Sequence, residues 1–250
     1  MSDLNFENRH IDRRPIRVEP DDKLYPERVK TLMGGKAPKH LDMVGNTELL
    51  NMAGLGFCGS RKSSPKGLET AHDCADQAAH SDVSVISGNA AGVDFEAHYN
   101  CLNAGGKTIL VLPEGINHFR IKKALEPVWD WGRVLVISQF ESDDPWKAFR
   151  AMTRNQLIIS LSRAMIVIEA GEKGGTLNAG KETLKFGLPL YVAQYQDMSV
   201  DARGNQMLLN MGALKLAKSR STNRANLAKV FESMKEDRLL KNTPVQGGLL

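Results

Sequence analysis

The chain has 250 residues, of which 42% are hydrophobic, which is enough to build the core of one large domain or two small ones. Its 33 basic and 29 acidic residues give a formal net charge of +4, an excess too mild to indicate a nucleic-acid-binding protein by itself. No apolar run approaches the roughly 20 residues that a membrane span requires, and the N-terminus lacks the apolar segment of a secretion signal. Three well-separated cysteines in apolar surroundings indicate reduced core residues, so we expect a soluble, cytoplasmic protein.

The N-terminal part of the chain is expected to be an arm followed by a cap. Residues 1–19 are polar and show no apolar periodicity, so we expect a flexible arm. Residues 20–53 contain a helical pattern at 24–33, ended by Gly34 and Gly35, and a second short one at 47–52. These pieces are too small to fold alone and predict a helical cap on the main domain.

From residue 55 onward, apolar strand patterns alternate with helical patterns. The strand patterns lie at 55–58, 83–87, 108–112, 134–138, 164–169 and 189–193. The helical patterns lie at 67–80, 92–103, 121–128, 146–161, 177–186, 205–210 and 223–234. This alternation is typical of a parallel sheet covered by helices on both faces. We therefore predict an α/β fold with a doubly wound, mostly parallel sheet over residues 54–235 and a flexible tail over 236–250.

Polar, glycine-rich turns follow the strand patterns, where ligands bind in folds of this class. They read GSRK at 59–62, SGNAAGVD at 87–94, PEGIN at 113–117 and EAGEKGGT at 169–176. The first combines a tight Gly-Ser turn, two cations and a helix start, which together favour an anion. We predict a phosphate-holding crevice, although α/β turns require glycines and small capping residues in any case.

The sequence matches two nucleotide-binding motifs in spacing, but not in the structural context or residues that each motif requires. Glycines 54, 56 and 59 fit the dinucleotide spacing, but the first two precede or lie within the strand rather than after it. Glycines 175 and 180 with Lys181 fit part of a P-loop, but Glu182 stands where Ser or Thr must reach magnesium. The six histidines show no metal-ligand spacing, so we predict neither a metal nor a cofactor.

Three residues keep two interpretations each. Asp94 could bond a ribose hydroxyl or cap its helix. Glu169 could act as a general base or satisfy neighbouring backbone amides. Trp146 could belong to the core or stack on a nucleobase, with the core favoured.

Taken in series, these segments resemble the DNA-processing protein A family, DprA/Smf. The matching segments are LYPERVKTLMGGKAPKHL, GSRKSSPKGLETA, SGNAAGVDFEAHYNCLNAGGKTILVLPEGI, TRNQLIISLSRAMIVIEAGEKGGTLNAGKETLKFG and RGNQMLLNMGA, within residues 20–235. The resemblance implies an extended Rossmann-like core that binds single-stranded DNA without catalysis, forms a homodimer and assists a RecA-type recombinase in recombination or natural transformation. The family's helical and winged-helix appendages are not found in the chain, so we expect the bare core.

The resemblance also implies which residues hold the DNA backbone. Three groups would each hold a phosphate, and the others would line the same groove. The three groups are Gly59, Ser60, Arg61 and Lys62; Ser87, Gly88 and Asn89; and Gly174, Gly175 and Thr176. The others are Gly92, Asp94, Arg154, Asn155 and Lys173.

The sequence departs from the family at two positions, where Ala91 and Gln156 replace arginines, so each removes an expected cation. The alternative function is a nucleotide sensor or a phosphoribohydrolase-like enzyme, whose Gly-Gly-Thr turn is similar. Those enzymes have a glutamate where this chain has Ala179. A third alternative is a structural partner protein that pairs through residues 205–217.

Overall fold

The computed structural model describes residues 14–195, 198, 202–219 and 221–235. These ranges contain one mixed sheet in the order β1-β2-β6-β5-β4-β3-β7-β8-β9. Its strands are β1 (Ile16–Val18), β2 (Leu41–Gly45), β3 (Gly54–Cys58), β4 (Ser84–Gly88), β5 (Thr108–Val111), β6 (Val134–Ser138), β7 (Ala164–Val167), β8 (Leu190–Ala193) and β9 (Leu214–Leu216). Every pairing from β6 to β9 is parallel, whereas β1 and β2 join antiparallel. The predicted doubly wound, mostly parallel sheet is confirmed.

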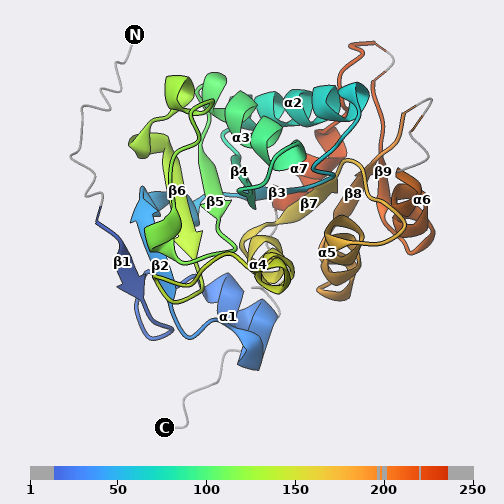
Figure 1. Ribbon diagram of the computed structural model, residues 1–250. Helices are drawn as coiled ribbons and strands as arrows, with labels where there is room; N and C mark the ends of the chain where they lie inside the picture. The colour runs from blue at the N-terminus through green and yellow to red at the C-terminus, as the bar shows by residue number, and fades with distance from the viewer. Residues whose placement is uncertain (1–13, 196–197, 199–201, 220, 236–250) are drawn as a thin grey trace, which may run out of the picture.

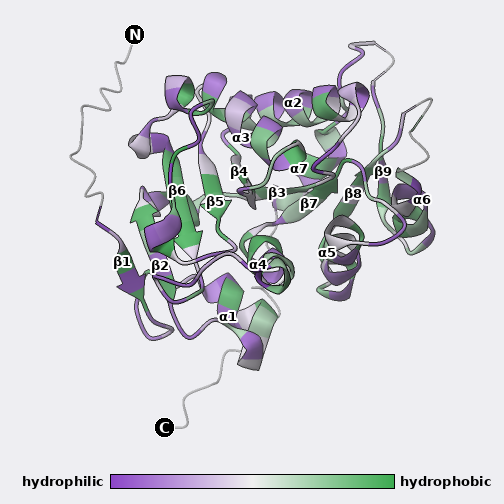
Figure 2. Ribbon diagram, in the orientation of Figure 1, coloured by the Kyte–Doolittle hydropathy of each residue, from purple (hydrophilic) through white to green (hydrophobic). Residues whose placement is uncertain are grey.

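Helices cover both faces of the sheet (Figure 1). They are α1 (Glu27–Met33), α2 (Pro65–His80), α3 (Val93–Asn103), α4 (Ala148–Leu161), α5 (Gly175–Lys185), α6 (Arg203–Asn210) and α7 (Ala228–Lys235). One buried cluster joins α2, α3 and α7 to one face, and a second joins α1, α4, α5 and α6 to the other. In Figure 2 the central strands are hydrophobic, while the helices carry both kinds of residue. The chain therefore has the pattern expected for a sheet that is buried on both faces.

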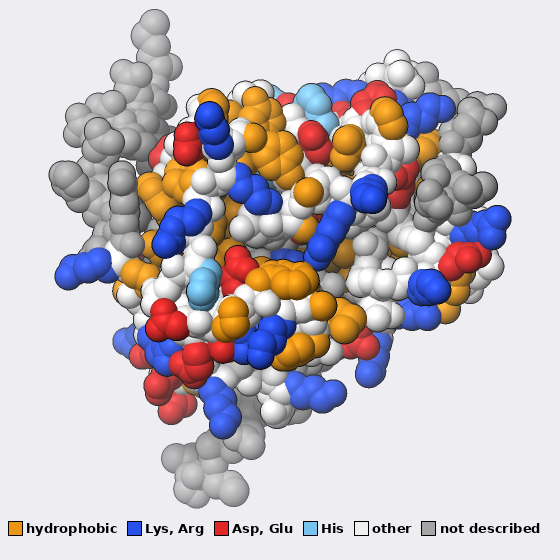
Figure 3. Space-filling view, in the orientation of Figure 1, with side chains coloured by type: hydrophobic (Ala, Val, Ile, Leu, Met, Phe, Trp, Pro, Cys, Tyr) orange, Lys and Arg blue, Asp and Glu red, His pale blue; other side chains and the backbone are white. Residues whose placement is uncertain are grey.

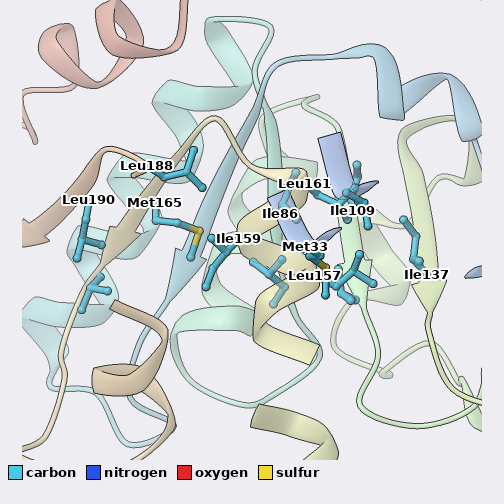
Figure 4. Packing of buried hydrophobic residues seen from close by; sticks show 14 of the residues in the cluster. Met33, Ile86, Ile109, Ile137, Leu157, Ile159, Leu161, Met165, Leu188 and Leu190 are labelled. Atoms are coloured by element: carbon cyan, nitrogen blue, oxygen red, sulfur yellow. The ribbon is translucent and has the colours of Figure 1, made fainter. Parts of the chain in front are cut away.

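Helix α4 is anchored to the sheet by its C-terminal half. Leu157, Ile159 and Leu161 point into the cluster shown in Figure 4, where they meet Ile86 from β4 and Met165 from β7. Burying an aliphatic side chain of this size stabilises the fold by about 1.5–3 kcal/mol. The firm packing of this half holds the opposite, N-terminal end of α4 at the carboxyl edge of the sheet.

Two strands were missed by the sequence analysis. Residues 16–18, expected in a flexible arm, form β1, and residues 41–45, expected in a helical cap, form β2. The pattern of β2 is interrupted by Asp42, which is buried but accepts two hydrogen bonds from Arg17, at 2.8 and 3.0 Å. A buried charge is tolerated when it is paired in this way. The rest of the expected arm, residues 1–13, and the expected tail, 236–250, lie outside the described residues.

The helix predicted over residues 121–128 is wrong. This segment forms turns and one short 3-10 helix, Glu126–Val128. Pro127 lacks an N–H group, and its ring would clash with the carbonyl of the residue four positions earlier in an α-helix. An eight-residue pattern also gains too little to offset helix nucleation without a well-packed face.

The order of the strands creates a switch point at the centre of the sheet. The chain builds outward from β3 through β4 and β5 to β6, then returns to place β7 on the other side of β3. Connections that leave adjacent strands in opposite directions open a crevice at the carboxyl ends of those strands. The carboxyl ends of β3 and β7 are therefore where the fold positions a binding site.

Candidate functional site

A cavity of about 480 Å³ lies at the carboxyl ends of β3 and β7, bounded on one side by α4 and on another by the start of α5. The predicted site residues that line it are Gly59, Ser60, Arg61, Asp94, Arg154, Asn155, Lys173, Gly175 and Thr176. The others do not line it, and these are Lys62, Ser87, Gly88, Asn89, Gly92 and Gly174. The structure thus brings most of the predicted residues together around one hollow.

The turn over residues 59–62 carries two cations, of which Arg61 lines the cavity and Lys62 does not. Arg61 and Lys62 are exposed, and within the described residues no hydrogen bond or ion pair ties their side chains. The turn itself is closed by a hydrogen bond of 3.0 Å from the backbone N–H of Lys62 to the Ser60 hydroxyl. A short side-chain-closed turn fixes the backbone while leaving both cationic side chains available to an anion.

The turn over residues 87–94 is stabilised by hydrogen bonds between its own residues. Asp94 is buried and accepts hydrogen bonds from the Ser87 hydroxyl at 3.0 Å and from the backbone N–H of Ala90 at 3.2 Å. Gly92 has a φ of +72°, and a Cβ there would approach the carbonyl oxygen of Ser60 to 2.4 Å. Asp94 therefore closes its own turn, and Gly92 lets this turn pack against the first.

Two residues that sequence reasoning missed support the same turn. Lys122 donates from Nζ to the carbonyl oxygens of Asn89 and Ala90, at 2.8 and 3.0 Å, and burial lowers its pKa. His98 lies with Nε2 2.8 Å from the carbonyl oxygen of Gly88, and burial lowers its pKa to about 4. Because a carbonyl only accepts, the neutral ring carries its proton on Nε2. Sequence reasoning did not identify Lys122 as a site residue because it placed residues 121–128 in a helix.

Arg154 is a buried cation at the cavity wall. Its side chain comes from α4, is only 5% exposed as a residue, and donates from Nη1 to the carbonyl oxygen of Val111 at 2.6 Å. Its Nε is buried with no hydrogen-bond partner among the described residues. A Cβ on Gly88 would come within 1.7 Å of Nη1, so only glycine leaves room for the guanidinium. An incompletely bonded buried cation beside a cavity favours an anion there.

The third turn opens helix α5. Gly174 precedes the helix with a φ of +111°, and no side chain caps the first turn. A Cβ on Gly174 or Gly175 would meet nothing within 4 Å, so this helix start faces open space. Its first N–H groups and the positive end of its dipole are available to an anion, with exposed Lys173 beside them.

Glu169 is fully occupied by structural hydrogen bonds. It accepts from the hydroxyls of Ser63 and Ser64, both at 2.6 Å, from the backbone N–H of Ser64 at 2.7 Å and from the Tyr195 hydroxyl. Burial raises the pKa of Glu169, but the hydrogen bonds from these partners outweigh it and the net pKa is lowered. Of the two interpretations, the structure matches the one in which this carboxylate ties a neighbouring loop to β7.

The three tryptophans fall into two classes. Trp129 and Trp131 pack edge to face with ring centroids 5.2 Å apart and belong to the surroundings of a buried cluster. Trp146 is 50% exposed and lines the cavity. The assignment of Trp146 to the core is therefore wrong.

The residues that depart from the family pattern lie as follows. Neither Ala91 nor Gln156 lines the cavity. The Gln156 amide donates to Glu182 of α5 at 3.3 Å, so it faces the neighbouring helix. Ala179 does line the cavity, at the position where the related hydrolases place a glutamate.

In the described part of the chain, no group of three His, Cys, Asp or Glu side chains is placed to hold a metal ion.

Within the described ranges, no helix has the length and apolar composition of a bilayer-spanning segment. In Figure 3 the hollow at the centre of the visible face is bordered by Lys and Arg side chains, and hydrophobic side chains gather over the position of α4. The face thus offers both charge and apolar surface to a ligand.

The chain is similar to known proteins over most of its length. It is 26% identical to a protein Smf of Synechocystis over 220 residues, which cover 85% of this chain but 54% of that protein, so it spans about half of that relative. The crystal structure of DNA processing protein A from Streptococcus pneumoniae matches with a TM-score of 0.72 and 27% identity, over 80% of this chain and 70% of that one. The same protein from Helicobacter pylori matches with a TM-score of 0.68 and 26% identity, over 82% and 91%. The family model for DNA recombination-mediator protein A covers residues 17–225. The chain therefore belongs to the DNA recombination-mediator protein A family.

Proposed function

We propose that the cavity at the ends of β3 and β7 holds the backbone phosphates of single-stranded DNA, and that the chain acts in recombination by binding rather than by hydrolysis. The observation that carries this proposal is the set of cations at the cavity that are unpaired, or only partly hydrogen-bonded, in the described structure. Arg61 and Lys173 line the cavity and are exposed, and Lys62 is exposed next to Arg61. Arg154 also lines the cavity but is buried, with its Nε unbonded in the described structure. Affinity for a polyanion comes mainly from such cations and from backbone amides.

The two acidic residues that line the cavity, Asp94 and Glu169, are not exposed beside these cations. Both are buried: Asp94 accepts hydrogen bonds within its own turn, and Glu169 accepts them from Ser63 and Ser64 of the neighbouring loop. Three helices also begin at this rim without a side-chain cap, namely α3, α4 and α5. Their dipoles add positive potential at the same edge.

Membership of the family supports the same choice of ligand. The related structure from Helicobacter pylori was described for its single-stranded DNA binding mode, and its match extends over 82% of this chain. A hydrolytic role has less support, because Ala179 occupies the place of the hydrolase glutamate and Glu169 already accepts four hydrogen bonds. We infer a binding protein.

The test is a fluorescence-anisotropy titration with labelled oligonucleotides at several salt concentrations. Replacing Arg61 and Lys62 with alanine should weaken binding at least tenfold and flatten the salt dependence, since each lost phosphate contact lowers the slope by about 0.7 for a single strand. The matched control is Lys36→Ala with Lys39→Ala, which removes the same charge from two exposed lysines outside the cavity lining. Equal affinity of the two double variants would refute the proposed site.

The size of the cavity is also compatible with a small ligand such as a free nucleotide. A volume of about 480 Å³ lies within the range of small-ligand sites, roughly 300–1,000 Å³. We therefore include free mononucleotides in the titration. If they displace the oligonucleotide at micromolar concentration, the nucleotide-sensor alternative is the better description.

Two finer proposals follow from the family. We propose a homodimer that pairs through the edge strand β9 and the end of α6, where Leu214 and Met211 are about half exposed, at 48% and 50%. We also propose that the bound strand is handed to a RecA-type recombinase. Sedimentation of the wild type and of Leu214→Asp tests the first, and recombinase filament assembly on coated DNA tests the second.

A further inference from the structure

An exposed apolar strip runs from the cavity along the start of α4. It consists of Trp146, Phe149 and Met152, which are 50%, 56% and 50% exposed. These three account for almost half of the seven large hydrophobic residues exposed in the described part of the chain. Phe149 and Met152 are three residues apart in α4 and lie on neighbouring positions of one helix side, and Trp146 lies in the loop just before the helix. Trp146 and Met152 also line the cavity, together with Arg61 and Lys173.

The loop before α4 and the first turn of the helix, which carry the strip, are tied to the rest of the protein. The Arg150 guanidinium lies 5.8 Å from the centre of the Phe149 ring, and it is tied to Asp144 at 2.6 Å and to the carbonyl oxygen of Pro145 at 2.6 Å. The preceding loop is bonded in turn to the body of the protein, for example by the backbone N–H of Gly115, 2.8 Å from the carbonyl oxygen of Asp144. Aromatic side chains that are positioned before binding lose little conformational freedom on binding.

We propose that Trp146 and Phe149, extended by Met152, form a stacking surface for nucleobases beside the phosphate-holding turns. This inference rests on the proposed function. Exposed aromatic faces next to unpaired cations match the two parts of a single-stranded nucleic acid, its bases and its phosphates. Stacking needs no particular base edge, so the strip adds affinity and favours single strands over duplexes, whose bases are already stacked.

The experiment compares two ligands and two classes of variant. The ligands are a fluorescein-labelled oligonucleotide and an abasic strand of the same length and charge. Removal of a stacking side chain costs about 1–3 kcal/mol per base, so Trp146→Ala and Phe149→Ala should each weaken binding of the normal strand roughly 5- to 150-fold. Binding of the abasic strand should be weaker than that of the normal strand in the wild type and should change little in either variant.

The controls separate stacking from other effects. Trp146→Phe should retain most of the affinity, whereas Trp146→Leu, which keeps apolar surface without a ring, should not. Leu24→Ala alters a residue that is 46% exposed outside the cavity lining and should have no effect. Quenching of tryptophan fluorescence by the normal strand, absent in Trp146→Phe, gives a readout that does not depend on affinity.

The outcomes distinguish this inference from the function on which it rests. If the wild type binds neither strand, the proposed function fails. If it binds both strands equally and Trp146→Ala and Phe149→Ala leave the affinity unchanged, the phosphate site stands and the stacking surface is refuted. The strip would then serve another partner, such as a protein.

Discussion

Two turns at the rim of the sheet look alike in sequence but differ in what their residues do. The turn at 59–62 leaves both of its cations unpaired in solvent, and only its backbone is fixed. The turn at 87–94 is bonded internally: Asp94 accepts from the Ser87 hydroxyl and the Ala90 N–H, and Lys122 donates to the carbonyl oxygens of Asn89 and Ala90. A glycine-rich turn after a parallel strand can therefore either receive a ligand or support the turn that does.

The two turns are in contact, so the second determines the position of the first. The backbone N–H of Val93 donates to the carbonyl oxygen of Ser60 at 3.3 Å, and a Cβ on Gly59 would approach the Val93 side chain to 2.4 Å. Variants of the second turn should thus change stability first and binding as a consequence. Variants of the first should change binding alone.

The largest effect is expected for Gly88→Ala. The new methyl group would lie 1.7 Å from Nη1 of the buried Arg154, so the guanidinium must leave its place beside Val111. Overpacking of this kind, together with a displaced buried charge, should cost about 3 kcal/mol or more. Chemical denaturation measures it, with Gly35→Ala as control, because a Cβ there meets nothing within 4 Å. A Gly88→Ala variant as stable as the control would contradict the packing described here.

The next effect concerns the dependence of stability on pH. The pKa of His98 is lowered from 6.5 to about 4 by burial, so the unfolded chain takes up a proton at a higher pH than the folded one. Stability is complete above pH 6.5 and should fall as the pH decreases towards 4, by on the order of 3 kcal/mol. Melting temperatures across this range should show the loss in the wild type and a shallower slope in His98→Gln. Parallel slopes would rule out His98 as the source.

A smaller loss is expected for Asp94→Ala. The variant leaves the backbone N–H of Ala90 without its acceptor and removes one of the two acceptors of the Ser87 hydroxyl, the other being the carbonyl oxygen of Phe57, which should cost about 2 kcal/mol. Arg61→Ala, in the open turn, should leave stability within about 0.5 kcal/mol of the wild type while weakening DNA binding. Urea denaturation and anisotropy on the same two variants test this contrast. It fails if Arg61→Ala is the less stable of the two.

The sequence predicts the parallel core well because each of its strands is a continuous apolar run. The strand at residues 134–138, for example, was predicted with the bounds that the structure has. It does not predict β2, whose buried Asp42 is understandable only when Arg17 and Ser142, far away in the chain, are seen beside it. For the same reason the roles of Asp94 and Glu169 could not be decided in advance, because each depends on partners that only the fold brings close.

Sequence reasoning could not predict which individual side chains are exposed either. Trp129, Trp131 and Trp146 occupy similar contexts between elements, and only packing separates the first two, beside a buried cluster, from the third at the cavity. Lys122 and Lys123 are adjacent in the chain, and the fold buries part of one while leaving the other exposed. These two lysines allow a comparison between a residue that supports the turn at 87–94 and an adjacent residue that only carries charge in solvent.

The smallest effect is predicted for Lys122→Met. The substitution keeps the apolar stem but removes the two hydrogen bonds that hold the carbonyls of Asn89 and Ala90, which should cost about 1 kcal/mol. Because Lys122 does not line the cavity, any loss of DNA affinity beyond that from removing one distant charge must come from a loosened turn at 87–94. Lys123→Met removes the same charge from the neighbouring exposed position and gives the purely electrostatic part. Hydrogen exchange at residues 89–94 should speed up in Lys122→Met and not in Lys123→Met, and equal exchange in both would mean that Lys122 is only another surface cation.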